Sequence, residues 1–268
     1  DAKPVALPLR QTFSLTVYNG NPAGAEHIVS TLLQAYCREH MELFIVRRNF
    51  NSIYADGSDL LQQLQAQTKV TLFEQDKETG LQELFERLMA IMGERMQLRN
   101  EFVQQNGLTR GDPQNTVRAF EYIHAHSTPL MVIFENYYEF AKSLYDGQAV
   151  MFAELFRAQD PNTTSKKNNG YGYNIYYTAC FGPGEYTLTA AQTPMADCFN
   201  PQKFTLMFGG QLDKCGAVPL PRDYLAINEP DEHYNHCVMY YQGRLAGLSL
   251  PCGELVHVEP DPDEVPII

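Results

Sequence analysis

The chain has 268 residues and a formal net charge of −12, and 44% of its residues are hydrophobic. That composition can build a packed globular core, while the acidic balance argues against DNA or RNA as a partner. No apolar run reaches the ~20 residues that span a bilayer, and the N-terminus lacks the apolar region of a secretory signal. We expect a globular chain that does not itself insert into a membrane.

The cysteines and the ends of the chain bear on its compartment and extent. The six cysteines are Cys37, Cys180, Cys198, Cys215, Cys237 and Cys252, with no C-x-x-C spacing among them. A chain of this size does not need disulfides, so we expect reduced thiols and a cytosolic setting. Because the sequence begins at Asp1 without a methionine, we expect a segment of a longer protein. With no repeat or clear linker, we predict one domain over 1–268, ending in an extended acidic tail over 258–268.

In the first half of the chain, β-prone runs alternate with helical apolar spacing. Phe13–Tyr18 predicts a strand, and Ile28, Leu32, Leu33 and Tyr36 predict a helix that begins near Ala25. Strands at Glu42–Arg47 and Lys69–Glu74 flank a short helix marked by Leu60, Leu61 and Leu64. A long helix follows, running to about Phe102, whose apolar stripe is Leu81, Leu84, Phe85, Leu88, Ile91 and Met92. Thr79 and Gln82 could form its capping box.

The second half continues the alternation and then changes. A loop over Asn106–Asn115 precedes a short helix, and the continuous apolar run Leu130–Phe134 predicts a strand buried on both faces of a parallel sheet. We expect a helix over Ser143–Arg157, with Met151, Phe152, Leu155 and Phe156 on one side, a polar loop over Asp160–Gly172 and a strand at Tyr173–Cys180. Further strands surround a hairpin turn at Gln242-Gly243. Alternating strands and helices predict an α/β fold with right-handed crossovers on a central parallel sheet.

The stretch Val17–Leu33, "VYNGNPAGAEHIVSTLL", runs from a strand through a glycine turn into a helix. That is the setting of the phosphate-binding motif G-x-x-x-x-G-K-[S/T], whose lysine and hydroxyl contact phosphate oxygens and Mg²⁺. If Gly24 is the second glycine, Ala25 replaces the lysine and Glu26 replaces the hydroxyl residue. If Gly20 is the first glycine, the loop is one residue short. Neither register supplies a lysine.

In this order of segments, the chain resembles the FtsK/SpoIIIE-type motor domains, and most closely the degenerate C-terminal ATPase modules of the EssC/EccC-type ATPase of type VII secretion. Besides Val17–Leu33, the likeness rests on segments with family-like order: "ELFIVRRNFNSIYADGSDL" (42–60), "LQELFERLMAIMGERMQLRNE" (81–101), "PLMVIFENYYEF" (129–140), "GYGYNIYYTA" (170–179), "FTLMFGGQL" (204–212) and "VMYYQGRLAGLSLP" (238–251). The resemblance implies a RecA-like P-loop NTPase fold, with a mostly parallel sheet flanked by helices and a C-terminal β-hairpin.

The same resemblance places a Walker B strand at "PLMVIFEN", where family members that hydrolyse ATP end in an Asp that helps to hold Mg²⁺, usually followed by a Glu that orients water. Here the pair is Glu135 and Asn136, and an amide cannot accept a proton from water. Thr178 matches the polar sensor position of the following strand. The implied relict nucleotide site is Gly20, Gly24, Ala25, Glu26, Glu135, Asn136 and Thr178, with no catalytic residue. We expect no hydrolysis and no resident cofactor, although helix and loop N–H groups leave weak binding of Mg²⁺·ATP open.

The resemblance therefore implies a non-hydrolysing module of a type VII secretion motor, acting in substrate recognition or in regulation of the upstream ATPase domains. Its implied partners are other ATPase modules of the same parent chain and small helical-hairpin secreted proteins. Its implied location is the cytoplasmic part of a bacterial membrane-anchored protein.

Other interpretations stay open. The site could hydrolyse ATP weakly, with groups supplied across an oligomer interface, as a protein or DNA translocase. The chain could also be an α/β binding protein of another kind. His233, His236 and Cys237 with Cys252 could form a metal site, but surface histidines beside a strand cysteine explain that pattern better. No G-x-S-x-G elbow supports a catalytic serine.

Overall fold

The computed structural model describes residues 8–21, 25–48, 51–108, 112–159, 172–189, 195, 198–231 and 236–249. Of residues 25–29, 113, 157–159, 236 and 249, only the backbone is described. Four predicted features therefore lie outside the described residues: the acidic tail, most of the loop 160–172, Gly24 and Cys252.

The strands form one eight-stranded sheet in the order β3-β2-β4-β5-β1-β6-β7-β8. Each pair among the first six strands of this order is parallel, whereas β6–β7 and β7–β8 are antiparallel. The strand bounds are β1 Ser14–Asn19, β2 Glu42–Arg47, β3 Val70–Glu74, β4 Leu130–Phe134, β5 Ile175–Phe181, β6 Phe204–Phe208, β7 His236–Tyr241 and β8 Arg244–Ser249. The predicted mostly parallel sheet and C-terminal hairpin are both confirmed.

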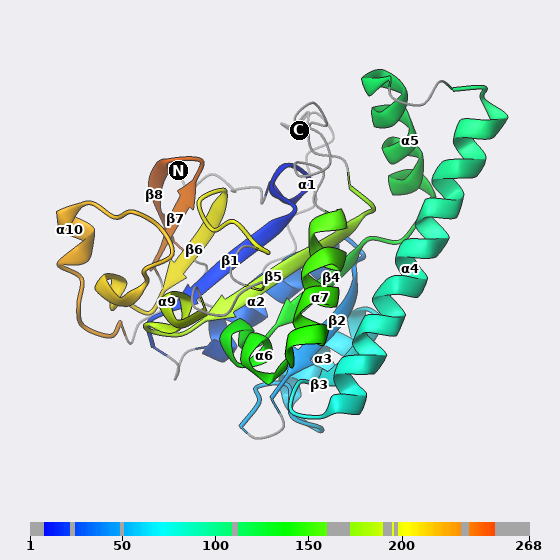
Figure 1. Ribbon diagram of the computed structural model, residues 1–268. Coiled ribbons are helices and arrows are strands. Elements are labelled where there is room, and N and C mark those ends of the chain that lie inside the picture. Colours follow the sequence, from blue (N-terminus) through cyan, green and yellow to red (C-terminus); the bar gives the residue numbers. More distant parts are fainter. Residues whose placement is uncertain are drawn as a thin grey trace.

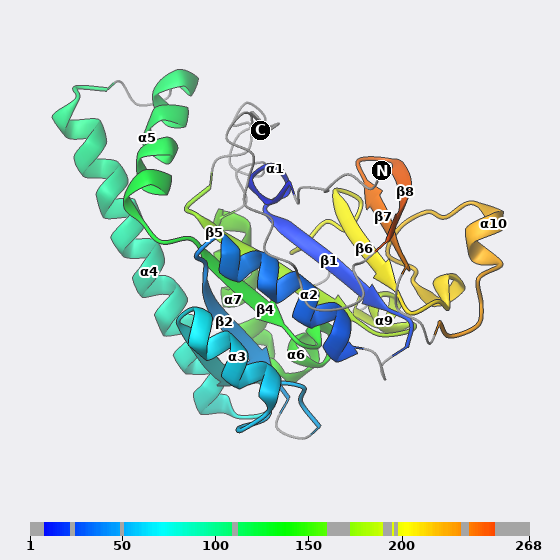
Figure 2. The same ribbon diagram turned by 180° about the vertical axis from the view of Figure 1, so that it is seen from behind.

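Helices cover both faces of the sheet (Figures 1 and 2). In Figure 1, α4, α6 and α7 lie in front of the sheet, and Figure 2 shows α2 and α3 on the opposite face. The helices are α1 Leu9–Thr12, α2 Ala25–Arg38, α3 Asp59–Gln67, α4 Glu78–Gln105, α5 Pro113–His126, α6 Tyr137–Ser143, α7 Asp146–Gln159, α9 Glu185–Thr189 and α10 Arg222–Leu225, with a 3₁₀ turn, η3, at Leu212–Lys214. The distal half of α4 and its partner α5 extend beyond the sheet as a helical hairpin.

Two layers of apolar side chains separate the sheet from its helices. Side chains alternate along β5, so that Tyr177 and Ala179 join the cluster under α4, α6 and α7, while Tyr176 joins the cluster under α2 and α3. Strand β4 is buried along its whole length because helices cover both of its faces. Its continuous apolar run predicted this position correctly.

The helix predictions need four corrections. Helix α4 extends to Gln105, and it begins without the predicted capping box, because its N-cap is Lys77 and Gln82 instead donates to Glu86 within the helix. The predicted helix over 143–157 corresponds to α7, which begins at Asp146, whereas α6 at Tyr137–Ser143 was not predicted, and Leu144 between them has an extended backbone. Met151 is 46% exposed and therefore does not join the buried side of α7.

Several other predictions can be compared with the described residues. The cysteines Cys37, Cys180, Cys215 and Cys237 are free thiols. Within the described part of the chain, no helix combines the length and apolarity needed to cross a membrane. The same residues contain no cluster of three or more His, Cys, Asp or Glu side chains suited to a metal ion.

Candidate functional site

The candidate site lies at the carboxyl edge of the parallel strands, where open α/β sheets bind their ligands. Strand β1 passes through Gly20 toward α2, which begins at Ala25 as predicted. Strand β4 ends in Glu135 and Asn136, and β5 lies between β4 and β1. The structure therefore brings Gly20 and the acid–amide pair to one edge. The side chains of Ala25 and Glu26, and all of Gly24, lie outside the described residues.

Glu135 anchors the loop that leads from β2 to α3. One of its carboxylate oxygens accepts a hydrogen bond from the backbone N–H of Arg48, and the other accepts one from the N–H of Ile53, both at 2.9 Å. The half-buried carboxylate thus satisfies two loop donors that have no strand partner. Each oxygen has committed a lone pair to the protein's own backbone.

Both polar groups of the Asn136 side-chain amide form hydrogen bonds within the protein. Its carbonyl oxygen caps α6 by accepting from the Glu139 backbone N–H at 2.9 Å, a common role for Asn at an N-cap. Its amide group donates to Glu185 at 2.8 Å, and the other oxygen of Glu185 accepts from the N–H of Gly182. Asn136 therefore joins the end of β4 to the first turn of α9.

Thr178 lies inside the sheet and not at its edge. In the strand register it stands opposite Leu15 of β1 and Ile133 of β4, and only 2% of its surface is exposed. Its hydroxyl shares a 2.8 Å hydrogen bond with the hydroxyl of Tyr36 on α2 and contacts the Met131 sulfur at 3.3 Å. The structure gives this hydroxyl a role in packing α2 onto the sheet.

Gly20 fits where no side chain could. A Cβ at this position would lie 2.0 Å from the carbonyl oxygen of Gly210, far inside contact distance. The Gly20 N–H donates to Phe208 at 2.7 Å, and its carbonyl accepts from the side-chain amide of Gln211 at 2.9 Å. The close approach of two backbones requires glycine here, so the residue is explained without a phosphate.

Charged groups at this edge interact mainly with the protein itself. Burial, with added contributions from the neighbouring carboxylates Glu135 and Glu185, raises the pKa of the Cys180 thiol to about 12. Arg47, the buried cation at the end of β2, donates to the Tyr54 carbonyl at 2.6 Å and pairs with Asp56 at 2.9 Å and with Glu74 at 3.5 Å. Its charge is therefore committed to protein groups.

Mg²⁺·ATP, which the fold type implies, does not fit this donor set. Glu135 and Asn136 are held by backbone and side-chain partners, and the sequence offers Ala25 and Glu26 where lysine and a hydroxyl are needed.

Sequence reasoning missed the groups that hold the candidate site together. Glu185, Tyr36 and Gln211 were not assigned to the site, since their partners there are 49, 142 and 191 residues away in the chain. The two adjacent glycines Gly209 and Gly210 were the local sequence signal of a tight backbone contact. Both have φ near +70° in the structure.

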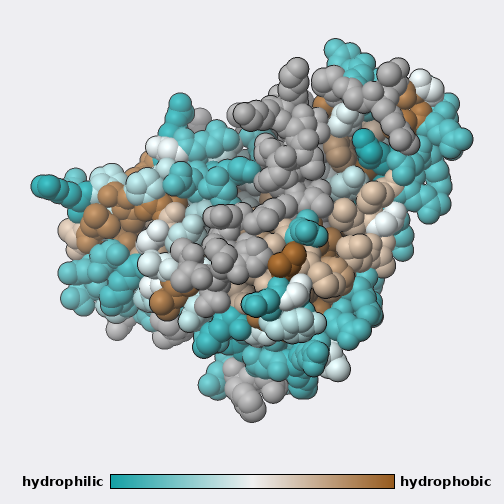
Figure 3. All heavy atoms as spheres, viewed as in Figure 1, coloured by the Kyte–Doolittle hydropathy of each residue, from teal (hydrophilic) through white to brown (hydrophobic). Residues whose placement is uncertain are grey.

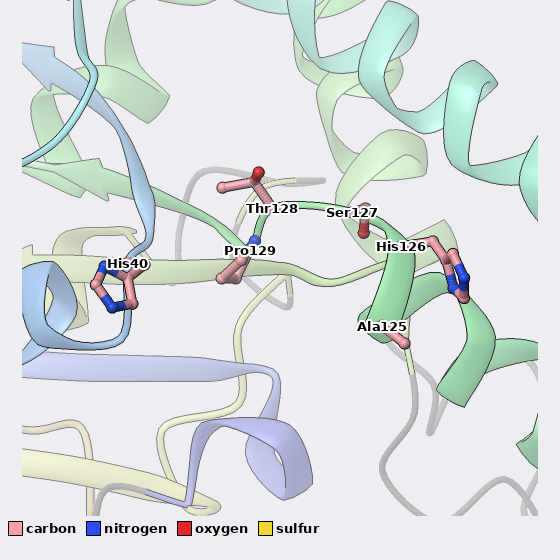
Figure 4. Close-up of a pocket in the computed structure, with 6 residues that line it drawn as sticks. All are labelled: His40, Ala125, His126, Ser127, Thr128 and Pro129. Atoms are coloured by element: carbon pink, nitrogen blue, oxygen red, sulfur yellow. The ribbon is translucent and has the colours of Figure 1, made fainter.

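A pocket of about 400 Å³ lies elsewhere, at the amino edge of the sheet (Figure 4). Its lining residues are His40, Ala125, His126, Ser127, Thr128 and Pro129. Pro129 immediately precedes β4, so the pocket is at the opposite end of that strand from Glu135. The ring of His126 stacks on Tyr122 at 3.9 Å, and its Nδ1 is 2.9 Å from the Tyr122 carbonyl oxygen.

Comparison with known proteins assigns the fold. No family model matches the sequence, and no curated protein matches it. Among solved structures, ATPases 2 and 3 of EssC from Geobacillus thermodenitrificans match with a TM-score of 0.59 and 12% identity, covering 93% of this chain and 39% of that one. The chain has the fold of these ATPase domains.

Two further structures agree with this assignment. The cytoplasmic domain of the type VII secretion ATPase EccC from Thermomonospora curvata has a TM-score of 0.53 at 12% identity, over 90% of this chain and 26% of that one. The pCW3 conjugation coupling protein TcpA, in a monomer form with ATPγS, has a TM-score of 0.55 at 12% identity, over 90% of this chain and 60% of that one. The resemblance to FtsK/SpoIIIE-type and EssC/EccC domains is confirmed at the level of fold, and the chain spans less than two thirds of each of these three chains.

Proposed function

We propose that this chain is a non-hydrolysing module of a type VII secretion motor, which binds protein partners in place of nucleotide. The observation that carries the proposal is the double engagement of Glu135 and Asn136. The positions that match the metal-holding and water-orienting carboxylates of active domains here connect the β2–α3 loop, α6 and α9. Structural neighbours among type VII secretion ATPase domains support the motor setting.

The edge of the sheet has kept the fold of a nucleotide site while its polar groups have acquired internal partners. Phosphoryl transfer requires charge neutralisation on the β/γ oxygens and an oriented nucleophile. Ala25, Glu26 and Asn136 provide neither. Energy for transport would therefore come from another module, and this one would recognise substrates or regulate its neighbours.

The proposed partners are other ATPase modules of the same parent chain and small helical-hairpin secreted proteins. The proposed setting is the cytoplasmic part of a bacterial membrane-anchored protein. The acidic charge of −12 opposes a role on nucleic acid.

A phosphate-release assay tests the proposal. The natural chain should release no phosphate from Mg²⁺·ATP above the buffer rate at any protein concentration. The matched variant Ala25→Lys/Glu26→Ser restores the missing lysine and hydroxyl in one register. Turnover by the natural chain that rises with protein concentration would contradict the proposal and favour an ATPase whose site is completed across an oligomer interface.

A further inference from the structure

Strand β8 forms one outer edge of the sheet, next to β7 (Figure 1). The two strands pair without a bulge, from Tyr241 opposite Arg244 to His236 opposite Ser249. Natural edge strands are usually protected by proline, by charged residues, by a bulge or by a covering segment. The sequence of β8, RLAGLS, has no proline, and its single charge is at its first residue. Within the described residues, no strand pairs with the outer side of β8.

The turn that joins β7 to β8 determines which backbone groups of β8 are free. Gln242 and Gly243 have φ values of 47° and 85°, as in the two-residue turns of tight hairpins. In such a hairpin the residues that flank the turn are hydrogen-bonded to each other, and hydrogen-bonded pairs alternate along the strands. Leu245, Gly247 and Ser249 therefore direct their N–H and C=O groups away from β7. In the part of the chain that the structure describes, these groups have no other backbone partner.

Both faces of β8 leave room for further apolar side chains. Leu245 contributes to the apolar cluster that contains Tyr240, and Leu248 contributes to the cluster on the opposite face of the sheet. Both leucines are only half-buried. A Cβ added to Gly247 would meet no atom within 4 Å. Figure 3 shows brown residues gathered over the region of β7, β8 and α10, so this end of the sheet has an apolar surface.

The sequence that follows β8 has the pattern of a second hairpin. Residues 250–253, LPCG, have proline at the second position and glycine at the fourth, which are the preferences of a type I turn. Four-residue hairpin loops are most often built around that turn. The next residues, Glu254–Val258, read ELVHV and contain three apolar side chains, two of them β-branched, which favours a strand. Both segments lie outside the described residues.

We propose that Glu254–Val258 turns back along β8 and adds to its outer side as a further antiparallel strand. A four-residue loop over 250–253 places Val256 opposite Gly247, where its side chain fills the open space. The same register places Val258 opposite Leu245. The free N–H and C=O groups of both β8 residues then gain partners.

The connection to β8 favours this segment over other occupants of the edge. Because only four residues separate it from β8, its effective concentration at the edge is roughly millimolar. A second copy of the chain would have to bind from solution and would bring its own net charge of −12. A covered edge prevents the sheet from pairing with the sheets of neighbouring proteins. The inference goes beyond the proposed function and depends neither on the nucleotide site nor on a role in secretion.

Hydrogen exchange of the full chain, resolved residue by residue by NMR, tests the proposal. The N–H groups of Ala246 and Leu248 point toward β7, and they should be protected whether or not the edge is covered. Those of Leu245 and Gly247 should exchange roughly 100-fold more slowly than unpaired amides, because the added strand bonds to them. Val256→Pro removes the N–H that bonds to Gly247, so it should reduce the protection of Leu245 and Gly247 by about tenfold or more.

A matched control and a measurement of self-association complete the test. Val265→Pro makes the same change in the acidic tail, outside the proposed strand, and should leave the exchange of Leu245 and Gly247 unchanged. Unaltered protection of the two amides that point toward β7 shows that each variant is folded. The proposal is overturned if Leu245 and Gly247 exchange as unpaired amides in the full chain, or if Val256→Pro leaves their protection unchanged. It is also overturned if sedimentation shows a dimer that Val256→Pro dissociates, since the segment would then cover the edge of a second copy.

Discussion

Replacing Glu135 by glutamine tests whether this residue stabilises the fold or serves as a metal ligand. The substitution is nearly isosteric, but glutamine keeps one carbonyl oxygen where the carboxylate serves two backbone donors, Arg48 and Ile53, each at 2.9 Å. One of these two bonds must be lost, and the new amide group then faces an N–H donor.

The expected cost follows from the geometry. Hydrogen bonds to a charged group contribute roughly 1.5–3 kcal/mol each, and water can replace part of a bond at a half-buried site, so we expect Glu135→Gln to lower the free energy of unfolding by about 2 kcal/mol. For a chain of this size that corresponds to a fall in Tm of roughly 4–8 °C. Urea and thermal denaturation, followed by circular dichroism, would measure it.

A matched control and an opposite outcome make the test decisive. Glu154→Gln makes the same chemical change at an exposed position on α7 and should stay within about 0.5 kcal/mol of the natural chain. If Glu135 instead were an unengaged metal ligand, removing its charge near Glu185 would relieve repulsion between the two carboxylates. A Glu135→Gln variant as stable as the natural chain, or more stable, would refute the structural role.

Three further predictions concern packing and pH. Gly20→Ala should destabilise the fold by about 3 kcal/mol, because the added Cβ would overlap the Gly210 carbonyl and disturb two hydrogen bonds. The control Gly93→Ala adds a Cβ in open space in the interior of α4 and should stabilise the fold by about 0.5–1 kcal/mol. Tyr36→Phe should cost about 1 kcal/mol, through loss of the buried bond to Thr178. Burial lowers the pKa of His124 from 6.5 to about 4, so the unfolded chain takes up this proton first as the pH falls. The free energy of unfolding should therefore decrease as pH drops from 6.5 toward 4, by up to about 3 kcal/mol.

The contradicting results are equally specific. Equal stability of Gly20→Ala and Gly93→Ala would show that the two backbones can separate at little cost. An unchanged unfolding midpoint in Tyr36→Phe would mean that the hydroxyl pair is not stabilising. A pH dependence between pH 6.5 and 4 that survives in His124→Gln would assign it to other groups.

The sequence predicted the features that depend on local spacing. The row Leu81, Leu84 and Leu88 predicted α4 because residues at helical spacing share one face, and the apolar run of β4 predicted burial from both sides. Sequence-based prediction failed where a residue distant in the chain determines the local conformation. Helix α6 was not predicted, and its N-cap Asn136 is bonded to Glu185, which is 49 residues away in the chain.

The candidate site shows the same division. The glycine turn and the pair Glu135–Asn136 were found from sequence, and the parallel sheet brings them to one edge. Their engagement could not be predicted, because the partners of Glu135 lie 87 and 82 residues away and the contact of Gly20 with Gly210 joins opposite ends of the chain. Thr178 was placed at the site by its match to the family's polar sensor position, and the strand register puts it inside the sheet.

Calorimetric titration of the full chain with Mg²⁺·ATP tests the central claim most directly. With Glu135 and Asn136 committed to internal bonds and no lysine in the loop, no heat of binding should be detectable at millimolar nucleotide. A micromolar dissociation constant that Glu135→Gln abolishes would contradict this, and would show that the carboxylate leaves its backbone partners to hold the metal.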